Sequence, residues 1–451
     1  MTTIVNPATQ ERIADVPDVG AGEVDRAVQR AVIAQQQWMS QPIRYRSRAL
    51  HRIADAVRAN VEILAGLETD NVGKPITDSR GEVDMVADTF DYYAGAVDKL
   101  VGQSIPVDGG IDFTVREPLG VVAVIAPWNF PLAIASWNIA PALACGNAVI
   151  VKPAEITPLS TLRLAAIVEE LDLPQGLLQV VTGRGSVVGA ALTEHALVDK
   201  ISFTGSTDTG KQIARVATGT LKRLTLELGG KSASVVFNDA DIEAAARSSV
   251  GAVFGNTGQD CCARSRILVQ RPVFDQFVKA FAEASQEATV GDPRDPATAL
   301  GPLVSKEHLA KVSSFLADDL DLVTVGTTPR GPGNWFTPRI AVAPPKEHRV
   351  VQEEVFGPIA SVIPFDTEAE AVHEANDTIY GLSGSVWTRD GAQALRVAGA
   401  IRTGSVSINS NTSVRIQTPF GGFKQSGMGR ELGLAALDSY TETKNIFYST
   451  T

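Results

Sequence analysis

The first hundred residues carry apolar positions at the spacing of amphipathic helices. Between residues 22 and 66, apolar side chains recur every three or four positions, beginning with Val24, Ala27, Val28, Ala31 and Val32. A charged, less apolar stretch of helical character continues to about Leu100. Since this spacing places apolar residues on one helix face, it predicts a helical N-terminal region.

Residues 104–120, SIPVDGGIDFTVREPLG, interrupt the helical pattern. A proline and paired glycines stand there between short β-rich runs. Turn residues in that position are typical of a β-hairpin, which we therefore expect in this segment.

From Val121 onward, buried strand patterns alternate with helical patterns. Continuous apolar runs occur in GVVAVIAP, AVIVKPA, LLQVV and KISFTGS, and helical stretches such as PLAIASWNIAPALACG separate them. This alternation predicts an open parallel sheet with helices on both faces, of the dinucleotide-binding type. A second α/β block is expected from about 230 to 425, with strands at SASVVF, SRILVQ, SVIPF and GSVSIN. No repeat or long linker separates the blocks, so they should pack closely.

Composition narrows the class of protein. The 451 residues, 44% hydrophobic and 20% charged, are enough for two or three globular domains. A formal net charge of -11 without a basic stripe argues against nucleic-acid and anionic-membrane partners. The first residues lack the basic and apolar regions of a signal peptide, and no apolar run is long enough to span a bilayer. Three cysteines in a chain of this length are typical of a protein in the reducing cytoplasm, where we therefore expect it. Scattered histidines without a metal-binding motif predict no metal site.

Two glycine-rich segments follow strands and precede helices, GRGSVVG at 183–189 and FTGSTDTG at 203–210. Either offers backbone N–H groups and the positive end of a helix to a pyrophosphate. Glycine between strand and helix is more often a simple turn, so neither segment decides the function alone.

Three further sites suggest chemistry. Cys261 and Cys262 stand side by side in FGNTGQDCCARSR, where the geometry disfavours a disulfide between them. Glu227, in LELGGKS, is either a buried strand carboxylate with a raised pKa, suited to general-base work, or a solvated strand end. Asn129, in APWNFPL, either donates to an oxyanion or caps a turn.

Together these segments resemble the aldehyde dehydrogenase superfamily from end to end. The matching stretches follow the family's order: NPAT at 6–9, PWNFP at 127–131, KPAE at 152–155, FTGS at 203–206, LELGGK at 226–231, GQDC at 258–261, EEVFGP at 353–358 and PFGGFKQSGMGRELG at 419–433. The resemblance implies an α/β fold with three parts. A Rossmann-type NAD-binding domain would comprise 1–100 and 119–229, and a catalytic domain 230–425. A small β oligomerisation element with a C-terminal arm would comprise 101–118 and 426–451.

By the same resemblance, Cys261 is the nucleophile, Glu227 the general base and Asn129 the side chain of the oxyanion hole. Cys262 is then a packed neighbour. The implied reaction is NAD-dependent oxidation of an aldehyde to the carboxylic acid through a thiohemiacetal and a thioester on Cys261. Glu227 would activate the water that hydrolyses the thioester.

The resemblance also implies binding residues. Those for the cofactor are Ile125, Trp128, Lys152, Glu155, Gly205, Ser206, Gly210, Leu228, Glu354 and Phe356. Glu155 would repel a 2′-phosphate, so NAD is preferred, while Lys152 leaves some tolerance for NADP. Those for the substrate are Phe130, Trp137, Asp260, Arg415 and Phe420. Asp260 favours a cationic aminoaldehyde and Arg415 an acidic semialdehyde, so these two predictions conflict.

The final SYTETKNIFYST resembles the family's oligomerisation strand. With the 104–120 hairpin it implies a homodimer or homotetramer, the alternative being an edge strand of the chain's own sheet. Three other functions compete: a coenzyme-A-acylating enzyme, a non-catalytic dinucleotide-binding relative, and a cysteine hydrolase without redox chemistry. Glu227 disfavours the coenzyme-A-acylating enzyme, because it favours release to water. Retention of Cys261, Glu227 and Asn129 together disfavours a non-catalytic relative. The lack of a histidine near Cys261 in sequence disfavours the cysteine hydrolase.

Overall fold

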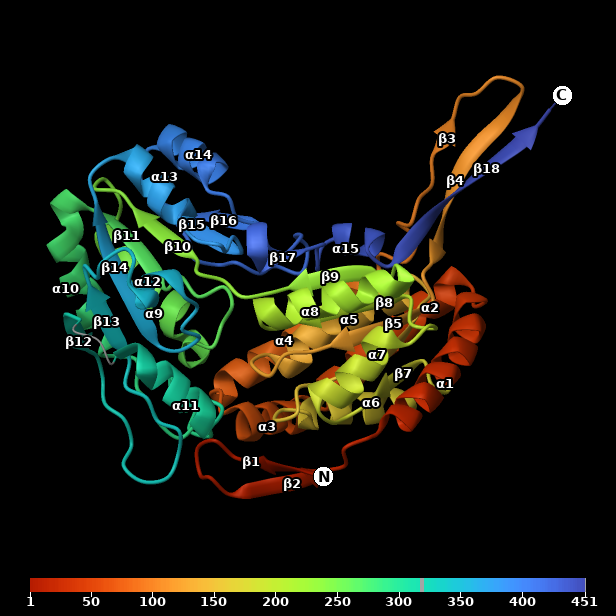
Figure 1. Cartoon of the computed structure of the whole chain (residues 1–451), viewed down its shortest axis with the longest axis horizontal. Coiled ribbons are helices and arrows are strands. Elements are labelled where there is room, and N and C mark those ends of the chain that lie inside the picture. The colour runs from red at the N-terminus through yellow and green to blue at the C-terminus, as the bar shows by residue number, and fades with distance from the viewer. Residues whose placement is uncertain (317–319, 451) are drawn as a thin grey trace.

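Two α/β lobes lie side by side, and a narrow β arm projects from one of them (Figure 1). The structure, a computed structural model, describes residues 1–316 and 320–450. Each lobe is built around its own largely parallel sheet. The two-block organisation predicted from the alternating pattern is therefore confirmed.

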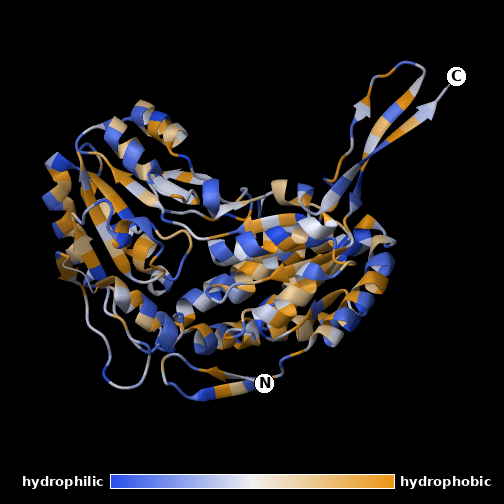
Figure 2. Cartoon of the chain, in the orientation of Figure 1, coloured by the Kyte–Doolittle hydropathy of each residue, from blue (hydrophilic) through white to orange (hydrophobic). Residues whose placement is uncertain are grey.

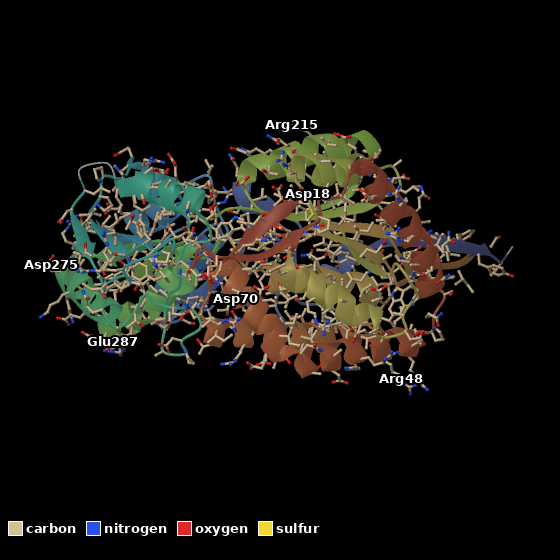
Figure 3. All side chains as sticks on the ribbon, turned by 90° about the horizontal axis from the view of Figure 1, so that it is seen from below. Asp18, Arg48, Asp70, Arg215, Asp275 and Glu287 are labelled. Atoms are coloured by element: carbon tan, nitrogen blue, oxygen red, sulfur yellow. The ribbon has the colours of Figure 1, made fainter. Side chains whose placement is uncertain are left out.

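The N-terminal helices cover the first lobe because each buries an apolar face. Their bounds are α1 (Ala21–Met39), α2 (Ile43–Ala59), α3 (Val61–Val72) and α4 (Ile76–Ala94). On α1, Val24 and Val28 are fully buried, as the spacing predicts, whereas Val32 is half-buried. Outward positions carry charge, and Arg48 of α2 lies at the molecular periphery (Figure 3). Ahead of the helices, β1 (Thr2–Val5) and β2 (Arg12–Val16) form a small antiparallel sheet.

The sheet of the first lobe has the strand order β17-β9-β8-β5-β6-β7. Its strands are β5 (Val121–Ile125), β6 (Ala148–Lys152), β7 (Leu178–Val180), β8 (Lys200–Thr204), β9 (Arg223–Glu227) and β17 (Gly427–Met428). All but β17 run parallel. Its helices are α5 (Pro131–Ala144), α6 (Leu159–Glu169), α7 (Ala190–Glu194) and α8 (Thr207–Ala217). Every residue of β5 and β6 is buried, which explains their unbroken apolar runs.

The sheet of the second lobe has the order β12-β13-β14-β11-β10-β15-β16. Its strands are β10 (Ala233–Val236), β11 (Arg266–Gln270), β12 (Leu322–Thr324), β13 (Arg339–Val342), β14 (Ile359–Phe365), β15 (Ser383–Trp387) and β16 (Ser405–Ile408). Its helices are α9 (Ile242–Phe254), α10 (Phe274–Ser285), α11 (Lys306–Ser313), α12 (Arg349–Gln352), α13 (Glu368–Asn376) and α14 (Gly391–Ala400). The four strands predicted from sequence are all present. The sheet also contains β15, whose buried Ser383 and Ser385 hide it from an apolar search.

The projecting arm is a three-stranded antiparallel sheet, in the order β18-β4-β3. It comprises β3 (Ser104–Ile105), β4 (Gly110–Pro118) and β18 (Thr441–Ser449). The predicted hairpin is confirmed, and β18 pairs with β4 of the same chain from Thr441↔Pro118 to Ser449↔Gly110. Apolar and polar residues alternate along the arm (Figure 2), and Phe447 and Tyr448 are more than half exposed.

The C-terminal segment 426–451 divides between two parts of the molecule. Its first residues form β17, which pairs with β9 at the edge of the first sheet. A short helix, α15 (Ala435–Asp438), follows, and Ala436, Leu437 and Tyr440 join the core of the first lobe. Only β18 belongs to the arm, so the expected element 426–451 is corrected to begin at about 441. No helix in the described part of the chain is long and apolar enough to cross a membrane.

Candidate active site

A cavity of about 700 Å³ opens at the carboxyl ends of the parallel strands of the first sheet and is closed by residues of the second lobe. Asn129, Glu227 and Cys261 all line it. Nine of the ten residues expected to bind the cofactor line it as well: Ile125, Trp128, Lys152, Glu155, Gly205, Ser206, Leu228, Glu354 and Phe356. Ligands of α/β sheets bind at this edge because the loops that follow parallel strands converge there.

Cys261 follows a strained turn after α9. Asn256 (φ 48°) and Thr257 (φ 55°) both adopt left-handed backbone conformations, and Gln259 leads from them to the cysteines. A side-chain hydrogen bond with Cys262, together with burial, raises the pKa of the Cys261 thiol well above its ordinary value. This environment favours the thiol form, and the thiolate is the form that acts as a nucleophile.

Cys262, unlike Cys261, does not line the cavity. Its side chain is buried in a small apolar cluster that includes Trp137 and Phe420, and its N–H donates to the Asp260 carboxylate at 2.8 Å. Asp260, Cys261 and Cys262 also form the one metal-ligand-like group in the described residues, with ligand atoms within 4.8 Å of one another. The third cysteine, Cys145, is buried in the core of the first lobe.

Glu227 ends β9 and is 3% exposed. Neither of its carboxylate oxygens has a hydrogen-bond partner among the described residues. Burial, and next the nearby Glu431 carboxylate, raise the pKa of Glu227 well above its ordinary value, while Arg430 acts in the opposite direction. Gly421 leaves room for this carboxylate, because a Cβ there would lie 2.7 Å from Glu227 Oε1. The buried alternative of the sequence analysis, rather than the solvated strand end, is confirmed.

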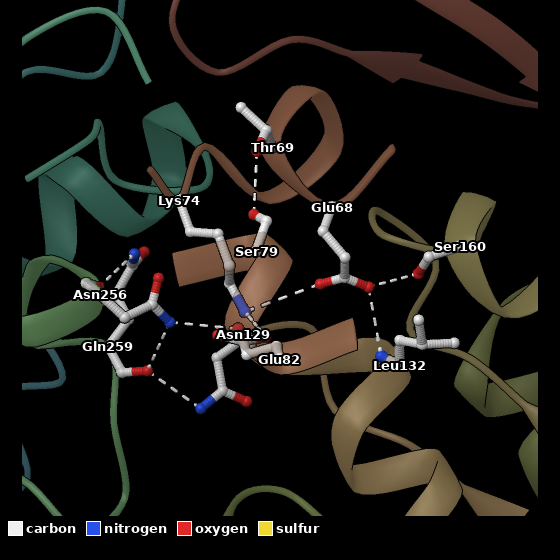
Figure 4. Close-up of polar contacts among 10 residues, drawn as sticks. All are labelled: Glu68, Thr69, Lys74, Ser79, Glu82, Asn129, Leu132, Ser160, Asn256 and Gln259. Atoms are coloured by element: carbon white, nitrogen blue, oxygen red, sulfur yellow. Dashed lines mark hydrogen bonds and ion pairs between the residues drawn. The ribbon is translucent and has the colours of Figure 1, made fainter. Parts of the chain in front are cut away.

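Asn129 lies in the loop between β5 and α5 and is 3% exposed. Its Nδ2 donates one hydrogen bond to the Gln259 carbonyl at 3.0 Å (Figure 4). A carboxamide carries two N–H donors, so one remains for a ligand in the cavity that Asn129 lines.

A buried ion cluster lies beside this loop (Figure 4). Lys74 Nζ stands 4.3 Å from the centre of the Phe130 ring, forms an ion pair with Glu82, and lies 3.6 Å from Glu68 Oε2. Glu68 in turn accepts hydrogen bonds from the Leu132 N–H, at 3.3 Å, and from a serine hydroxyl of α6. The cluster therefore ties α3 and α4 to the first turn of α5, directly after Asn129. Sequence reasoning missed it, because a Lys and two Glu in helical segments read as solvated.

The far half of the cavity suits a dinucleotide. Ser206 caps α8 by accepting a hydrogen bond from Thr209 N–H, so the positive end of that helix opens beside Gly205. Glu155, beyond the end of β6, accepts a hydrogen bond from Gly185 N–H at 2.6 Å, and Gly185 begins the π-helical turn of the GRGSVVG segment. Burial lowers the pKa of Lys152, whose Nζ donates to the Pro153 carbonyl at 2.9 Å.

Gly210 is the tenth expected cofactor residue, and it does not line the cavity. A Cβ on Gly210 would lie 2.5 Å from a methyl carbon of Leu228. Its lack of a side chain lets α8 approach Leu228, which does line the cavity. Gly210 therefore has a packing role in the structure, and its expected contact with the cofactor stays a prediction.

Glu354 and Phe356 bring the second lobe to the cavity. Glu354 Oε1 accepts a hydrogen bond from Gly230 N–H at 2.8 Å, and burial raises the pKa of Glu354 to about 7. The Phe356 ring packs edge-on against Trp128 at 5.1 Å between ring centres. His308, which sequence reasoning missed, completes this aromatic wall 5.0 Å from Trp128, and burial lowers its pKa to about 4. It stands in an ordinary amphipathic helix, so no motif marks it.

The expected substrate residues divide into two groups. Phe130, Trp137 and Phe420 gather with Cys261 in one apolar cluster, and the Trp137 and Phe420 rings meet edge-on at 5.5 Å. Asp260 lies beside the nucleophile, but its carboxylate faces the Cys262 N–H. Arg415 is exposed and belongs neither to this cluster nor to the cavity lining.

Comparison with known proteins agrees with this geometry. A model of the Aldehyde dehydrogenase family matches residues 1–446. Betaine aldehyde dehydrogenase of Bacillus subtilis is 41% identical, covering 99% of this chain and 94% of its own length. Retinal dehydrogenase 2 of Homo sapiens is 40% identical, and the match covers 98% of this chain and 88% of that protein.

Solved structures are equally similar. Betaine aldehyde dehydrogenase from Staphylococcus aureus in complex with NAD+ superposes with a TM-score of 0.96 at 38% identity, covering 100% of this chain and 91% of that one. An indole-3-acetaldehyde dehydrogenase of P. syringae in complex with NAD+ and IAA gives a TM-score of 0.97 at 40% identity, and the match covers 99% of this chain and 93% of that one.

Proposed function

This chain belongs to the aldehyde dehydrogenase family, and we propose that Cys261, Asn129 and Glu227 carry out the NAD-dependent oxidation of an aldehyde to its carboxylic acid. The observation that supports these roles is their convergence. A cysteine, a carboxamide with a free N–H and a buried carboxylate line one cavity at the carboxyl edge of a dinucleotide-type sheet.

Cys261 begins the reaction as a thiolate, once its thiol proton has passed to solvent. The sulfur adds to the aldehyde carbon, and the carbonyl electron pair moves onto oxygen, giving a thiohemiacetal oxyanion. The free N–H of Asn129 and the backbone N–H of Cys261 stabilise that charge, and one such donor is worth roughly 3–4 kcal/mol in comparable sites. Collapse of the oxyanion expels the aldehyde hydrogen with its electron pair and leaves a thioester on Cys261.

The cavity fits NAD, whose nicotinamide, when bound, supplies the acceptor for that hydride. Ser206 and the first turn of α8 would face the pyrophosphate, and Lys152 and Glu155 the adenosine ribose. Glu354 would hold the nicotinamide ribose, beside the ring of Phe356. Because a Glu155 carboxylate repels a 2′-phosphate, we expect NAD to be preferred over NADP. An equal or better rate with NADP in parallel titrations would overturn this assignment.

Glu227 completes the reaction. Its carboxylate takes a proton from water, the resulting hydroxide adds to the thioester carbon, and the C–S bond breaks to release the acid and the Cys261 thiolate. The burial that raises the pKa of Glu227 makes it a stronger base once it is ionised. Release to coenzyme A instead of water is the competing outcome, and coenzyme-A-dependent turnover would favour it.

The substrate that fits best is an apolar aldehyde, aromatic or long aliphatic. Phe130, Trp137 and Phe420 share one apolar cluster with Cys261. Arg415 is exposed and does not line the cavity, and the Asp260 carboxylate accepts a hydrogen bond from the Cys262 N–H, so we base the substrate class on the apolar cluster. Relatives include a phenylacetaldehyde dehydrogenase of Pseudomonas fluorescens, 42% identical over 98% of this chain.

The experiment is NADH formation by wild type and Cys261→Ala with aliphatic, aromatic, amino- and carboxy-aldehydes. Turnover by wild type alone, fastest with the aromatic or long aliphatic compounds, is the expected result. Turnover by both proteins would refute the assignment of Cys261. A preference for amino- or carboxy-aldehydes would refute the apolar substrate and leave the reaction intact.

We also propose a homo-oligomer built through the projecting arm, working in the reducing cytoplasm. The arm exposes Ile111, Phe447 and Tyr448, and apolar side chains on a narrow projecting sheet are typical of an interface. All three cysteines are free thiols. Light scattering should give a dimer or tetramer for wild type and a smaller species for Phe447→Lys. A monomeric wild type would refute the proposal.

A further inference from the structure

We propose that Asn256 is a positioning residue that holds the oxyanion-stabilising Asn129 in register with the nucleophile. The inference rests on the proposed role of Asn129. Asn256 itself is 7% exposed and does not line the cavity, so it acts through its neighbours.

The Asn256 carboxamide bridges the two segments that meet at the reacting carbon (Figure 4). Its Nδ2 donates to the Asn129 carbonyl at 3.1 Å and to the Gln259 carbonyl at 3.2 Å. The first carbonyl belongs to the loop after β5, and the second lies two residues before Cys261. One carboxamide therefore fixes the distance between the loop of the oxyanion donor and the loop of the nucleophile.

Gln259 closes the network from the other side. Its backbone N–H and its Nε2 both donate to the Asn256 carbonyl, at 3.1 and 3.0 Å, and its Oε1 accepts from Val304 N–H at 2.9 Å. The Gln259 carbonyl is also the acceptor for Asn129 Nδ2. This bond sets the rotation of the Asn129 carboxamide, and hence the direction of its second, free N–H.

The backbone of this turn is held in a conformation that it would not adopt by itself. Asn256 and Thr257 are consecutive left-handed residues, and the left-handed region is unfavourable for a β-branched threonine. Thr257 Oγ1 donates to the Gly301 carbonyl at 2.9 Å, which anchors the turn in the second lobe. Such a turn persists because its surroundings determine it, and strained backbone of this kind is concentrated at functional sites.

This positioning role predicts how far the rate of hydride transfer should fall when Asn256 is replaced. Without the bridge, the Asn129 carboxamide and Cys261 no longer share a fixed separation, so the transition state loses part of one oxyanion donor. Hydride transfer should slow by about 10- to 100-fold, less than the roughly 100- to 1,000-fold expected when that donor is deleted. Binding of NAD should not change, because the hydrogen bonds of the Asn256 side chain among the described residues go to Asn129 and Gln259 and not to an expected cofactor residue.

The test measures the single-turnover rate of NADH formation in Asn256→Gly and Asn256→Asp. Glycine keeps the left-handed backbone and removes the bridge, while aspartate keeps the shape and removes the donors. Asn409→Gly is the matched control. Asn409 is also left-handed (φ 49°) and bonds to Thr388 through its side chain, away from the cavity.

The deciding measurement is the double variant Asn129→Ala/Asn256→Gly. If Asn256 acts through Asn129, the double variant is no slower than Asn129→Ala alone, whereas independent losses multiply. Multiplied losses, a matching loss in Asn409→Gly, or a changed Kd for NAD would overturn the proposal. A wild-type rate in Asn129→Ala would instead refute the proposed role of Asn129. Should Asn256→Gly fail to fold, Asn256→Asp provides the same comparison.

Discussion

Replacing Glu227 by Gln removes the proposed base while keeping its size and its place at the end of β9. The carboxylate is buried and has no hydrogen-bond partner among the described residues, so its loss breaks no hydrogen bond there. Formation of the thioester does not need this base, whereas hydrolysis does. We therefore expect a pre-steady-state burst of NADH, close to one per active site, followed by slow turnover.

The size of the effect follows from general-base catalysis. A positioned base contributes about 10²- to 10⁴-fold, which corresponds to roughly 3–5 kcal/mol of barrier. The steady-state kcat of Glu227→Gln should fall by that factor. Because the pKa of Glu227 is raised, wild-type hydrolysis should accelerate as the pH rises, and the variant should lose that dependence.

Stability provides an independent check on the same residue. A carboxyl group with a raised folded-state pKa stabilises the protein below its unfolded pKa, and this contribution is lost as the pH rises through the folded pKa. Glutamine does not ionise, so Glu227→Gln should become progressively more stable than wild type as the pH rises above the ordinary pKa of a glutamate. Stopped-flow absorbance gives the burst, and urea unfolding at several pH values gives the free energy. Loss of the burst and of turnover by equal factors would refute the role in hydrolysis.

Three other predictions follow from buried groups near the site. Lys74→Met should lower the free energy of unfolding by about 3–5 kcal/mol, because it leaves two carboxylates buried without their cation; unchanged urea unfolding would contradict this. Burial raises the pKa of Glu431 to about 7. The free energy of unfolding of Glu431→Gln should therefore exceed that of wild type by up to about 3 kcal/mol at pH 8, where Glu431 is ionised, and by little at pH 5. An equal difference at both pH values would contradict this. Gly229→Ala should raise the KM for NAD about tenfold, which corresponds to about 1.4 kcal/mol of binding free energy. The reason is that the new Cβ would stand 2.4 Å from Glu354 Oε2 and displace that carboxylate. An unchanged KM would show that Glu354 does not hold the cofactor.

The architecture could be predicted from sequence wherever burial is uniform. The strands β5 and β6 are buried on both faces and appear as unbroken apolar runs. By contrast, β15 satisfies buried serines through neighbouring side chains, such as the Ser385 hydroxyl on Asn411 at 2.6 Å. Such a strand looks polar until its partners are known. The split of segment 426–451 was equally hidden, because two residues of β17 are too few to carry a pattern.

At the site, motifs located the groups that meet the ligands but did not specify their direction. Asp260 and Arg415 offered opposite predictions of substrate charge, and the sequence held nothing to decide between them. In the structure the Asp260 carboxylate accepts a hydrogen bond from the Cys262 N–H, two residues along the chain, and the Arg415 side chain is exposed, so the direction of each side chain is known only from the fold. The same reasoning separates Asn129 from Asn256. Both are asparagines in the loops of the site, yet Asn129 lines the cavity, whereas Asn256 does not and donates to two backbone carbonyls. Only the identity of the residues is encoded locally, whereas the division between reacting and positioning groups arises when the two lobes close on each other.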